Sequence, residues 1–246
     1  MTAPLFLADS VPDTVGAVAV ITGTEAHHAA TVRRLQVGEQ VYVADGRGHA
    51  SFGPVLSVAK TTVEVSVSQV CVEPPRPRRW VAIQALPKGE RAELAVEMLT
   101  ELGVDVIVAW QAARSVSRWD GAAAKVEKGV AKWGKTVREA AKQSRRFTVP
   151  EVQYASSAQV AEWVRSAALA VVCHEEASMW VESLTMPATG DVVFIIGPEG
   201  GISAEELAAL EAAGGVPVRI ASQVLRTSTA GAVALAELQS LSRRVV

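Results

Sequence analysis

The sequence lacks the residues and patterns that define several protein classes. Its two cysteines, Cys71 and Cys173, lie far apart, with neither a paired spacing nor a histidine companion. This scarcity argues against a disulfide framework and against a structural zinc site. No cluster of metal-ligand residues occurs elsewhere, so we expect no metal. Both cysteines are expected to behave as buried small hydrophobic residues.

Long apolar segments are also missing. No apolar run approaches the roughly 18 residues needed to span a bilayer, so we expect no membrane partner. Met1 to Ser10 has no basic start and carries Asp9, which makes it a poor signal peptide. The chain has 246 residues, 49% of them hydrophobic, and can bury a core in one large or two small domains. We therefore expect a globular protein that works in the cytoplasm.

Two common nucleotide-binding motifs are absent. No dinucleotide-type glycine motif follows the first strand expected in the α/β part, and GxxxxGK[ST] occurs nowhere. Neither NAD nor a P-loop nucleotide therefore has a basis in the sequence.

The net charge of −2 discourages a nucleic-acid interpretation, but the distribution of charge favours one. Residues 1–73 carry 4 basic and 7 acidic side chains, and residues 151–246 carry 5 and 11. Residues 74–150 carry 15 basic and 8 acidic side chains. The middle third is thus a local basic field that could attract phosphate.

The first seventy residues show the alternation of half-buried strands. Residues 40–56 are typical of a hairpin around a turn, and residues 61–67 continue the period of two. A stretch rich in proline and arginine then breaks the periodicity. We expect a small β domain over residues 1–73, a stiff linker over 74–79 and a second domain over 80–246.

Beyond the linker, short apolar runs alternate with helical stretches, which predicts an α/β fold with a parallel sheet. In the first helix, Leu94, Met98, Leu99 and Leu102 recur at helical spacing, and Gly103 supplies a stop. Periodicity alone predicts an ordinary doubly wound fold, because true knots are rare. The expected buried strands are residues 80–86, 104–110, 169–173, 192–196 and 216–220.

A long amphipathic helix is predicted from about Ala122 to Arg146. Its apolar positions share one face, whereas Arg138, Lys142 and Arg145 share another at steps of four and three residues. Such a cationic row can follow a ribose-phosphate backbone, so RNA binding is our preferred interpretation and a solvated face is the alternative. The RNA-binding residues expected here are Lys132, Lys135, Arg138, Lys142, Arg145 and Arg146.

Two late loops are the most informative features of the chain. The apolar run 192–196 leads straight into the turn Gly-Pro-Glu-Gly-Gly at 197–201, and Ser203 with Glu206 forms a capping box that starts a helix. Glycine lacks a Cβ, so a small molecule can approach the main chain closely. Residues 218–230 repeat this plan with a short strand, an irregular loop and an alanine-rich helix. One such turn could be a simple tight connection, but the pair indicates a ligand site.

Together the two loops closely resemble the C-terminal motifs of the RsmE-type 16S ribosomal RNA (uridine-N3) methyltransferases of the SPOUT superfamily. Residues 97–104 and 132–146 match the same family, so the resemblance spans nearly the whole chain. It implies a C-terminal SPOUT-type parallel sheet with a deep trefoil knot that binds S-adenosylmethionine.

The N-terminal part resembles, more loosely, the PUA-like RNA-binding β-barrel domain that this family carries ahead of its catalytic domain. The match rests on Glu25 to His28 and on Val32 to Gly38. A structural role is favoured for the two histidines, whereas Arg33 and Arg34 are better candidates for phosphate contact.

The resemblance implies that backbone groups of three loops hold the cofactor. This sequence has Ala221-Ser222 where the family commonly has Leu-Gly, and Ser228 where it commonly has Glu. The implied cofactor-binding residues are His174, Glu175, Ile196, Gly197, Pro198, Glu199, Gly200, Gly201, Ile220, Ser222, Val224, Leu225 and Arg226.

Methyl transfer from a sulfonium requires a nucleophile held in line behind the methyl carbon. Uridine N3 is a poor nucleophile while protonated, so a group must take its proton or stabilise the resulting charge on the carbonyl oxygens. Arg226 is the first candidate for stabilisation, followed by Arg138 and Arg145, which could come from the partner in a homodimer. Glu199 could accept the proton, or could equally cap backbone amides in its turn.

The main hypothesis is thus methylation of N3 of a specific uridine in 16S ribosomal RNA of the 30S subunit. A SPOUT methyltransferase for transfer RNA or for another base atom would have similar cofactor loops. A non-catalytic RNA-binding protein of ribosome assembly is another alternative, and failure to bind S-adenosylmethionine would favour it. A generic α/β small-molecule binder would leave the β domain and the basic region without a purpose.

Overall fold

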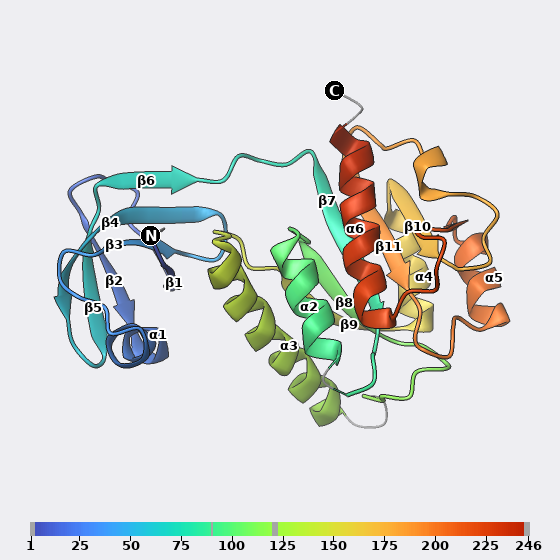
Figure 1. The fold of residues 1–246 in the computed structure, drawn as a ribbon, viewed down its shortest axis with the longest axis horizontal. Coiled ribbons are helices and arrows are strands. Elements are labelled where there is room, and N and C mark those ends of the chain that lie inside the picture. The colour runs from blue at the N-terminus through green and yellow to red at the C-terminus, as the bar shows by residue number, and fades with distance from the viewer. Residues whose placement is uncertain (1–2, 90, 120–122, 244–246) are drawn as a thin grey trace. The chain divides into compact units, whose positions relative to one another are not determined.

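The computed structural model describes residues 3–89, 91–119 and 123–243, and the chain divides into two compact units (Figure 1). The first unit comprises Met1–Pro75 and Arg138–Val149, and the second comprises Arg76–Val137 and Pro150–Val246. Met1 and Ala122, at which we expected the first domain and the basic helix to begin, lie outside the described residues.

The first unit is built on a six-stranded sheet in the order β1-β3-β4-β5-β2, with β6 also paired to β4. The predicted hairpin is confirmed, because β3 and β4 pair antiparallel, and β1 pairs parallel to β3. Apolar side chains on one side of these strands form the core of the unit. The strands are β1 (Leu5–Leu7), β2 (Val18–Thr22), β3 (Gln40–Ala44), β4 (His49–Val58), β5 (Thr62–Ser66) and β6 (Gln69–Val72), and β2 is followed by α1 (Gly23–His27) and the π-helix η1 (His28–Val32).

Strand β4 bends so that its first half pairs with β3 and β6 and its second half with β5. The register shifts between Val55 and Ser57, as expected of a β-bulge. Gly53 lies just before this shift, and a Cβ there would come within 1.8 Å of the carbonyl oxygen of Ser66. The bend thus depends on a residue without a side chain.

The second unit contains a six-stranded sheet in the order β12-β10-β11-β7-β8-β9, and all its pairings are parallel, which confirms the predicted α/β architecture. The prediction missed β9 and began β7 two residues late, since β7 starts within the expected linker. The strands are β7 (Arg78–Ala85), β8 (Val106–Gln111), β9 (Glu151–Ser156), β10 (Leu169–Cys173), β11 (Gly190–Ile196) and β12 (Val216–Val218).

Helices cover both faces of this sheet (Figure 1). One face packs against α4 (Ser157–Ser166) and α5 (Ala204–Ala212), as the cluster containing Ile83, Val164 and Leu210 shows. On the other face lie α2 (Arg91–Glu101) and α6 (Thr227–Arg243), side by side. A 3-10 turn, η2 (Val181–Ser183), lies between β10 and β11, and α3 (Ala123–Ser144) is the predicted basic helix. Among the described residues, no helix combines the length and apolarity needed to cross a bilayer.

Both cysteines are free thiols whose residues keep some exposed surface, whereas we expected both to be buried. The thiol group of Cys173 is nevertheless shielded from water. Cys71 lies on β6, which among the described strands pairs with β4 alone and therefore keeps one edge open. Cys173 is the last residue of β10, at the end of the sheet where a cavity opens.

Candidate functional site

The carboxyl ends of β10, β11 and β12 meet at a cavity of about 410 Å³. Its volume lies in the range of about 300–1,000 Å³ that is usual for small-molecule sites. Three neighbouring parallel strands end at this edge, so the loops that follow them converge there. Of the cofactor residues predicted from the sequence, all but one line this cavity: His174, Glu175, Ile196, Gly197, Pro198, Glu199, Gly201, Ile220, Ser222, Val224, Leu225 and Arg226.

The glycine-rich turn has the conformation that its sequence predicts. Gly201 has φ +73° and donates its N–H to the carbonyl oxygen of Pro198 at 2.9 Å. The capping box is confirmed, because Ser203 Oγ accepts the N–H of Glu206 at 3.2 Å and Glu206 Oε2 accepts the N–H of Ser203 at 3.3 Å. Helix α5 therefore starts at a fixed point directly after the turn.

Gly200 is the exception among the predicted pocket residues. A Cβ at this position would lie 3.1 Å from Cβ and 3.3 Å from the carbonyl oxygen of Arg114. The Arg114 guanidinium also donates to the carbonyl oxygen of Gly200 at 3.2 Å. A side chain at Gly200 would thus point at the loop after β8, where space is tight. Gly200 does not line the cavity, so its predicted contact with the cofactor stays a prediction.

Glu206 connects Ser203, just after the glycine-rich turn, to two other segments of the second unit. Besides its capping bond, its Oε1 accepts the N–H of Ala113 and the hydroxyl of Ser157, each at 2.8 Å. Its side chain is therefore buried with every contact satisfied by a donor. The sequence pattern showed the capping role of Glu206 but not these long-range contacts.

The loop 220–225 lines the cavity along its whole length. In the part of the chain that the structure describes, the N–H groups of these residues donate no hydrogen bond to protein. Neither Ala221 nor Ser222 has a positive φ, so the loop does not need the glycine that the family commonly has here. Unpartnered main-chain donors around a pocket are suited to hold a ligand.

Arg219 fixes the start of this loop. Its guanidinium carbon lies 5.3 Å from the ring centroid of Trp180, and its Nε donates to the carbonyl oxygen of Glu175 at 3.1 Å. Its backbone also pairs with the segment after β10, through Met179 and Val181. Arg219 therefore joins two of the three pocket loops.

The ionisable groups of the cavity come from several elements. The carboxylate of Glu199 accepts the backbone N–H of Lys88 at 3.1 Å, so Glu199 does cap an amide, although not one in its own turn. Burial raises the pKa of the Cys173 thiol to about 12, which keeps it protonated near neutral pH. The prediction did not include Arg91, Cys173, Arg219 and Thr227, which also line the cavity.

The predicted RNA-binding residues of α3 are divided between the two units. Lys132 and Lys135 belong to the second unit, and Lys132 forms an ion pair with Glu93. The remaining residues, Arg138, Lys142, Arg145 and Arg146, belong to the first unit, as do Arg33 and Arg34. Of these six, Arg33, Arg34, Arg138 and Arg145 are exposed.

The ammonium group of Lys142 is paired with two carboxylates and is little exposed to solvent. Its Nζ lies 2.7 Å from Glu25 Oε1 and 2.8 Å from Glu139 Oε1, and only 9% of its side chain is exposed. Burial lowers the pKa of Lys142, but the hydrogen bonds to Glu139 and Glu25 outweigh this, and the pKa is raised. A buried, doubly paired ammonium is poorly available to phosphate, so we withdraw Lys142 from the expected RNA contacts.

No group of three or more His, Cys, Asp or Glu side chains among the described residues could hold a metal ion. The cavity is lined by loop residues, apolar side chains and a few separate charges, a lining that suits an organic ligand.

Comparison with known families identifies this β unit and the parallel sheet beside its loop-lined pocket as a PUA domain and an RNA methyltransferase domain. Residues 74–239 match the family described as the RNA methyltransferase domain, and residues 21–68 match the RNA methyltransferase PUA domain. The chain belongs to the ribosomal RNA small subunit methyltransferase E family.

Its relatives cover nearly the whole chain. The ribosomal RNA small subunit methyltransferase E of Mycobacterium tuberculosis is 45% identical over 99% of this chain and 94% of the relative. That of Bacillus subtilis is 32% identical over 89% and 88%. A Legionella pneumophila structure described as a methyltransferase in complex with its cofactor SAM superposes with a TM-score of 0.85, at 27% identity and 98% coverage of both chains.

Proposed function

We propose that this chain transfers the methyl group of S-adenosylmethionine to N3 of a specific uridine in 16S ribosomal RNA of the small ribosomal subunit. One observation carries the proposal: residues 220–225, whose main-chain N–H groups donate no hydrogen bond to the described part of the protein, line a cavity at the strand ends of an RNA methyltransferase domain. Relatives along the whole chain are named ribosomal RNA small subunit methyltransferases, and a solved neighbour contains SAM.

The residues of the pocket fit this cofactor. Ile196, Ile220 and Leu225 offer apolar surface for a flat adenine ring, and the loop amides offer donors for its polar edge. The carboxylates of Glu175 and Glu199 line the same cavity and offset a positive sulfonium charge. When bound, the cofactor supplies an electrophilic methyl group.

The side chains of the pocket then act on uridine. The guanidinium of Arg226 stabilises the negative charge that spreads onto the two carbonyl oxygens as N3 loses its proton. Glu199 accepts that proton, because a carboxylate that caps one amide keeps lone pairs for a second interaction. Arg138 and Arg145 are second candidates for charge stabilisation, from the partner subunit of a homodimer.

The finer features of the fold belong to the same proposal. Strand β12 lies at the edge beside β10, yet α6, which follows it, packs against β7, β11 and α2. The chain must pass the connection between β10 and β11, whose Trp180 pairs with Arg219. We propose that this path forms the trefoil knot, and that the enzyme acts as a homodimer in the cytoplasm. The proposed RNA contacts are Arg33, Arg34, Lys132, Lys135, Arg138, Arg145 and Arg146.

Methyl incorporation into an unmodified 16S ribosomal RNA transcript tests this function. Arg226→Ala should lower kcat about 100-fold or more, as removal of a single charge-stabilising donor does elsewhere. Calorimetry should still detect S-adenosylmethionine binding, since most proposed cofactor contacts come from the main chain. Arg165→Ala, which removes an exposed arginine of α4, is the control. Full activity of Arg226→Ala would refute its role, and wild-type protein that binds no S-adenosylmethionine would refute the function.

A further inference from the structure

Two arginines adopt a backbone conformation that side chains usually avoid. In the described part of the chain, Arg34 (φ 53°) and Arg145 (φ 58°) are the non-glycine residues with positive φ. Glycine is the usual residue in this left-handed region because it has no Cβ. Both arginines are exposed and both belong to the first unit, so neither conformation serves to bury the side chain. Strain of this kind is concentrated at functional positions.

Two hydrogen bonds to the last turn of α3 fix the backbone of Arg145. Its N–H donates to the carbonyl oxygen of Lys142 at 3.2 Å, and the N–H of Arg146 donates to that of Ala141 at 2.9 Å. These two bonds form the Schellman motif, in which the left-handed position is normally glycine. The helix end therefore dictates the conformation of Arg145.

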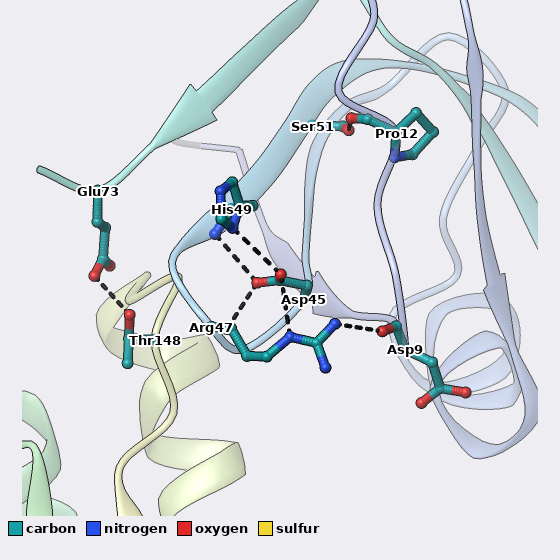
Figure 2. A network of polar contacts seen from close by, with 8 residues as sticks. All are labelled: Asp9, Pro12, Asp45, Arg47, His49, Ser51, Glu73 and Thr148. Carbon is teal, nitrogen blue, oxygen red and sulfur yellow. Dashed lines mark hydrogen bonds and ion pairs between the residues drawn. The ribbon is translucent and has the colours of Figure 1, made fainter.

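The chain after Arg145 is fixed as well. Glu73 accepts the N–H of Phe147 and the hydroxyl of Thr148, each at 2.8 Å, and its contact with Thr148 is drawn in Figure 2. The N–H of Val149 donates to the carbonyl oxygen of Gly46 at 2.9 Å. Residues 147–149 thus join the β3–β4 turn of the first unit.

The receiving turn is held by several polar contacts (Figure 2). The carboxylate of Asp45 accepts the N–H groups of Arg47 at 2.7 Å and of His49 at 3.1 Å, and its ion pairs with both side chains are shown in the figure. Arg47 also donates to the carbonyl oxygen of Asp9 at 3.0 Å. Arg145 therefore precedes a segment that is bound to a closed network.

Arg34 occupies an equivalent position after η1. The N–H of Arg33 donates to His28, and that of buried Leu35 donates back across the turn to Ala29, each at 3.0 Å. The side chain of Gln36 closes the turn by donating to the carbonyl oxygen of Arg34 at 2.9 Å. The exposed arginine is thus fixed between bonded neighbours.

The Lys142–Glu25 ion pair joins α1 to the last turn of α3, the two α-helices nearest in sequence to these turns. Glu25 lies in α1, which leads through η1 to Arg34, and Lys142 lies three residues before Arg145. Arg138 shares the helix face of Lys142 and Arg145. The ammonium of Lys142 is neutralised between two carboxylates, so the arginines around it carry the available positive charge.

We infer that Arg34 and Arg145 are two pre-set phosphate contacts of one RNA-binding surface, assembled from α1–η1 and the end of α3, with Lys142 as an internal strut. This inference rests on the proposed function for the nature of the ligand. A fixed backbone lowers the entropy that an arginine loses when it grips phosphate, which is the advantage gained for the strained conformation.

Replacing each arginine with glycine separates a functional role from a structural one. Arg34→Gly and Arg145→Gly relieve the strained φ, so each should raise Tm by about 2–4 °C. Each should also weaken binding of an unmodified 16S ribosomal RNA transcript about tenfold and reduce the slope of log K against log salt by about 0.7–0.9. Arg34→Lys and Arg145→Lys should keep the slope near that of the wild type.

Filter binding over about 50–200 mM salt measures these slopes, and calorimetry measures Tm. Arg165→Ala, with the same loss of charge on α4, should leave the slope unchanged. A raised Tm with an unchanged slope, or an equal loss of slope in Arg165→Ala, would overturn the inference. Should glycine prevent folding, Arg34→Asn and Arg145→Asn also tolerate this φ and give the same test. If the wild type binds the transcript without methylating it, the proposed activity fails while this inference stands.

Discussion

Lys142 illustrates how the role of one residue depends on a distant partner. Helical spacing placed it in a cationic row with Arg138 and Arg145, which is all that local periodicity can show. Its partner Glu25 is 117 positions away in sequence, and only the folded first unit brings the two together. The pair has few exposed atoms, so it stabilises the unit instead of presenting charge to a ligand.

The stability contributed by Lys142 should depend on pH. The folded-state pKa of Lys142 is raised above 10.5, so this contribution is present below that pH and is lost as pH rises through the raised value. Lys142→Met should lower the free energy of unfolding by about 3 kcal/mol at neutral pH, because it leaves the buried Glu25 carboxylate unpaired. Urea denaturation should find this deficit shrinking above pH 10.5.

The matched control is Lys135→Met on the exposed part of the same helix, which should change stability little at any pH. A deficit in Lys142→Met that stays constant from neutral to strongly alkaline pH would contradict the assignment of its stabilising effect to the ion pair.

Residues of the pocket were predictable where the signal is local. The capping box Ser203–Glu206 and the glycine-rich turn define the second loop within a few residues, so most of its pocket positions could be named. Arg91 could not, because its place at the cavity depends on β7 lying beside β11, which no short pattern encodes. The close approach of Gly200 to Arg114 could not be predicted either, since Arg114 comes from the loop after β8.

At the scale of elements, strand types were predictable and strand bends were not. Alternation identified β3, β4 and β5, but the division of β4 between two sets of partners depends on Gly53 and the bulge after it. Strand β9 was missed because its burial is incomplete and its sequence, Glu-Val-Gln-Tyr-Ala-Ser, lacks a continuous apolar run.

Gly53→Ala should therefore be among the most damaging single changes in the first unit. The added Cβ would meet the main-chain carbonyl oxygen of Ser66 at 1.8 Å, so a strand would have to move. We expect a loss of about 3 kcal/mol or more in unfolding free energy, measured by denaturant titration. Gly16→Ala is a useful contrast, since no atom lies within 4 Å there and its cost is confined to a positive φ. Equal losses in the two variants would contradict this explanation of the bend.

The buried side-chain amide of Gln84 forms a hydrogen bond to Thr227, the first residue of helix α6. Gln84 on β7 is fully buried, and its Nε2 donates to the carbonyl oxygens of Ala85 at 3.1 Å and Thr227 at 3.3 Å. Within the described residues its Oε1 has no hydrogen-bond partner, and it lies 3.1 Å from where a Cβ of Gly231 would be. The bond from the Gln84 Nε2 group therefore positions the first turn of α6, in which Thr227 lines the cavity.

Gln84→Leu should release that turn. We expect KM for S-adenosylmethionine to rise about five- to tenfold with a smaller change in kcat, because two bonds of about 1 kcal/mol each are lost while Arg226 remains. Steady-state methylation kinetics give this split. An unchanged KM together with an unchanged kcat would show that the bond to Thr227 does not position the pocket.

For the whole molecule, the sequence indicated two domains but not the membership of every segment. Residues 138–149 lie far from the first seventy-five residues in sequence, yet they group with them. Phe147 and Val149 pack against the small cluster formed by Leu5, Leu7, Ala44 and Ala50. Charge and periodicity predict α3 as a single helix. They do not show that the residues at its end pack with the first unit and not with the second.

The described core clusters of the first and the second unit share no residue, so a ligand of the second unit should protect that unit selectively. Some strands can unfold locally only if the cofactor site unfolds with them. S-adenosylmethionine at about 100 times its Kd should raise the free energy of that local unfolding by about 2.7 kcal/mol. Hydrogen exchange read by mass spectrometry should slow in β10, β11, β12 and their loops, and stay unchanged in β3, β4 and β5. Equal protection in both sets would contradict the assignment of the ligand to the second unit.

The shared helix has a consequence for how this chain can be recombined. A chimaera joined at residues 74–79 would take its N-terminal part from one relative and everything after it from another. Phe147, Val149 and the partners of Glu73 would then come from the second relative, although they contact the N-terminal part. The exchanged N-terminal module would then lack part of its own interior. Chimaeras between relatives should therefore succeed only when residues 138–149 travel with the N-terminal piece, so selection on these two stretches is coupled despite their separation in the gene.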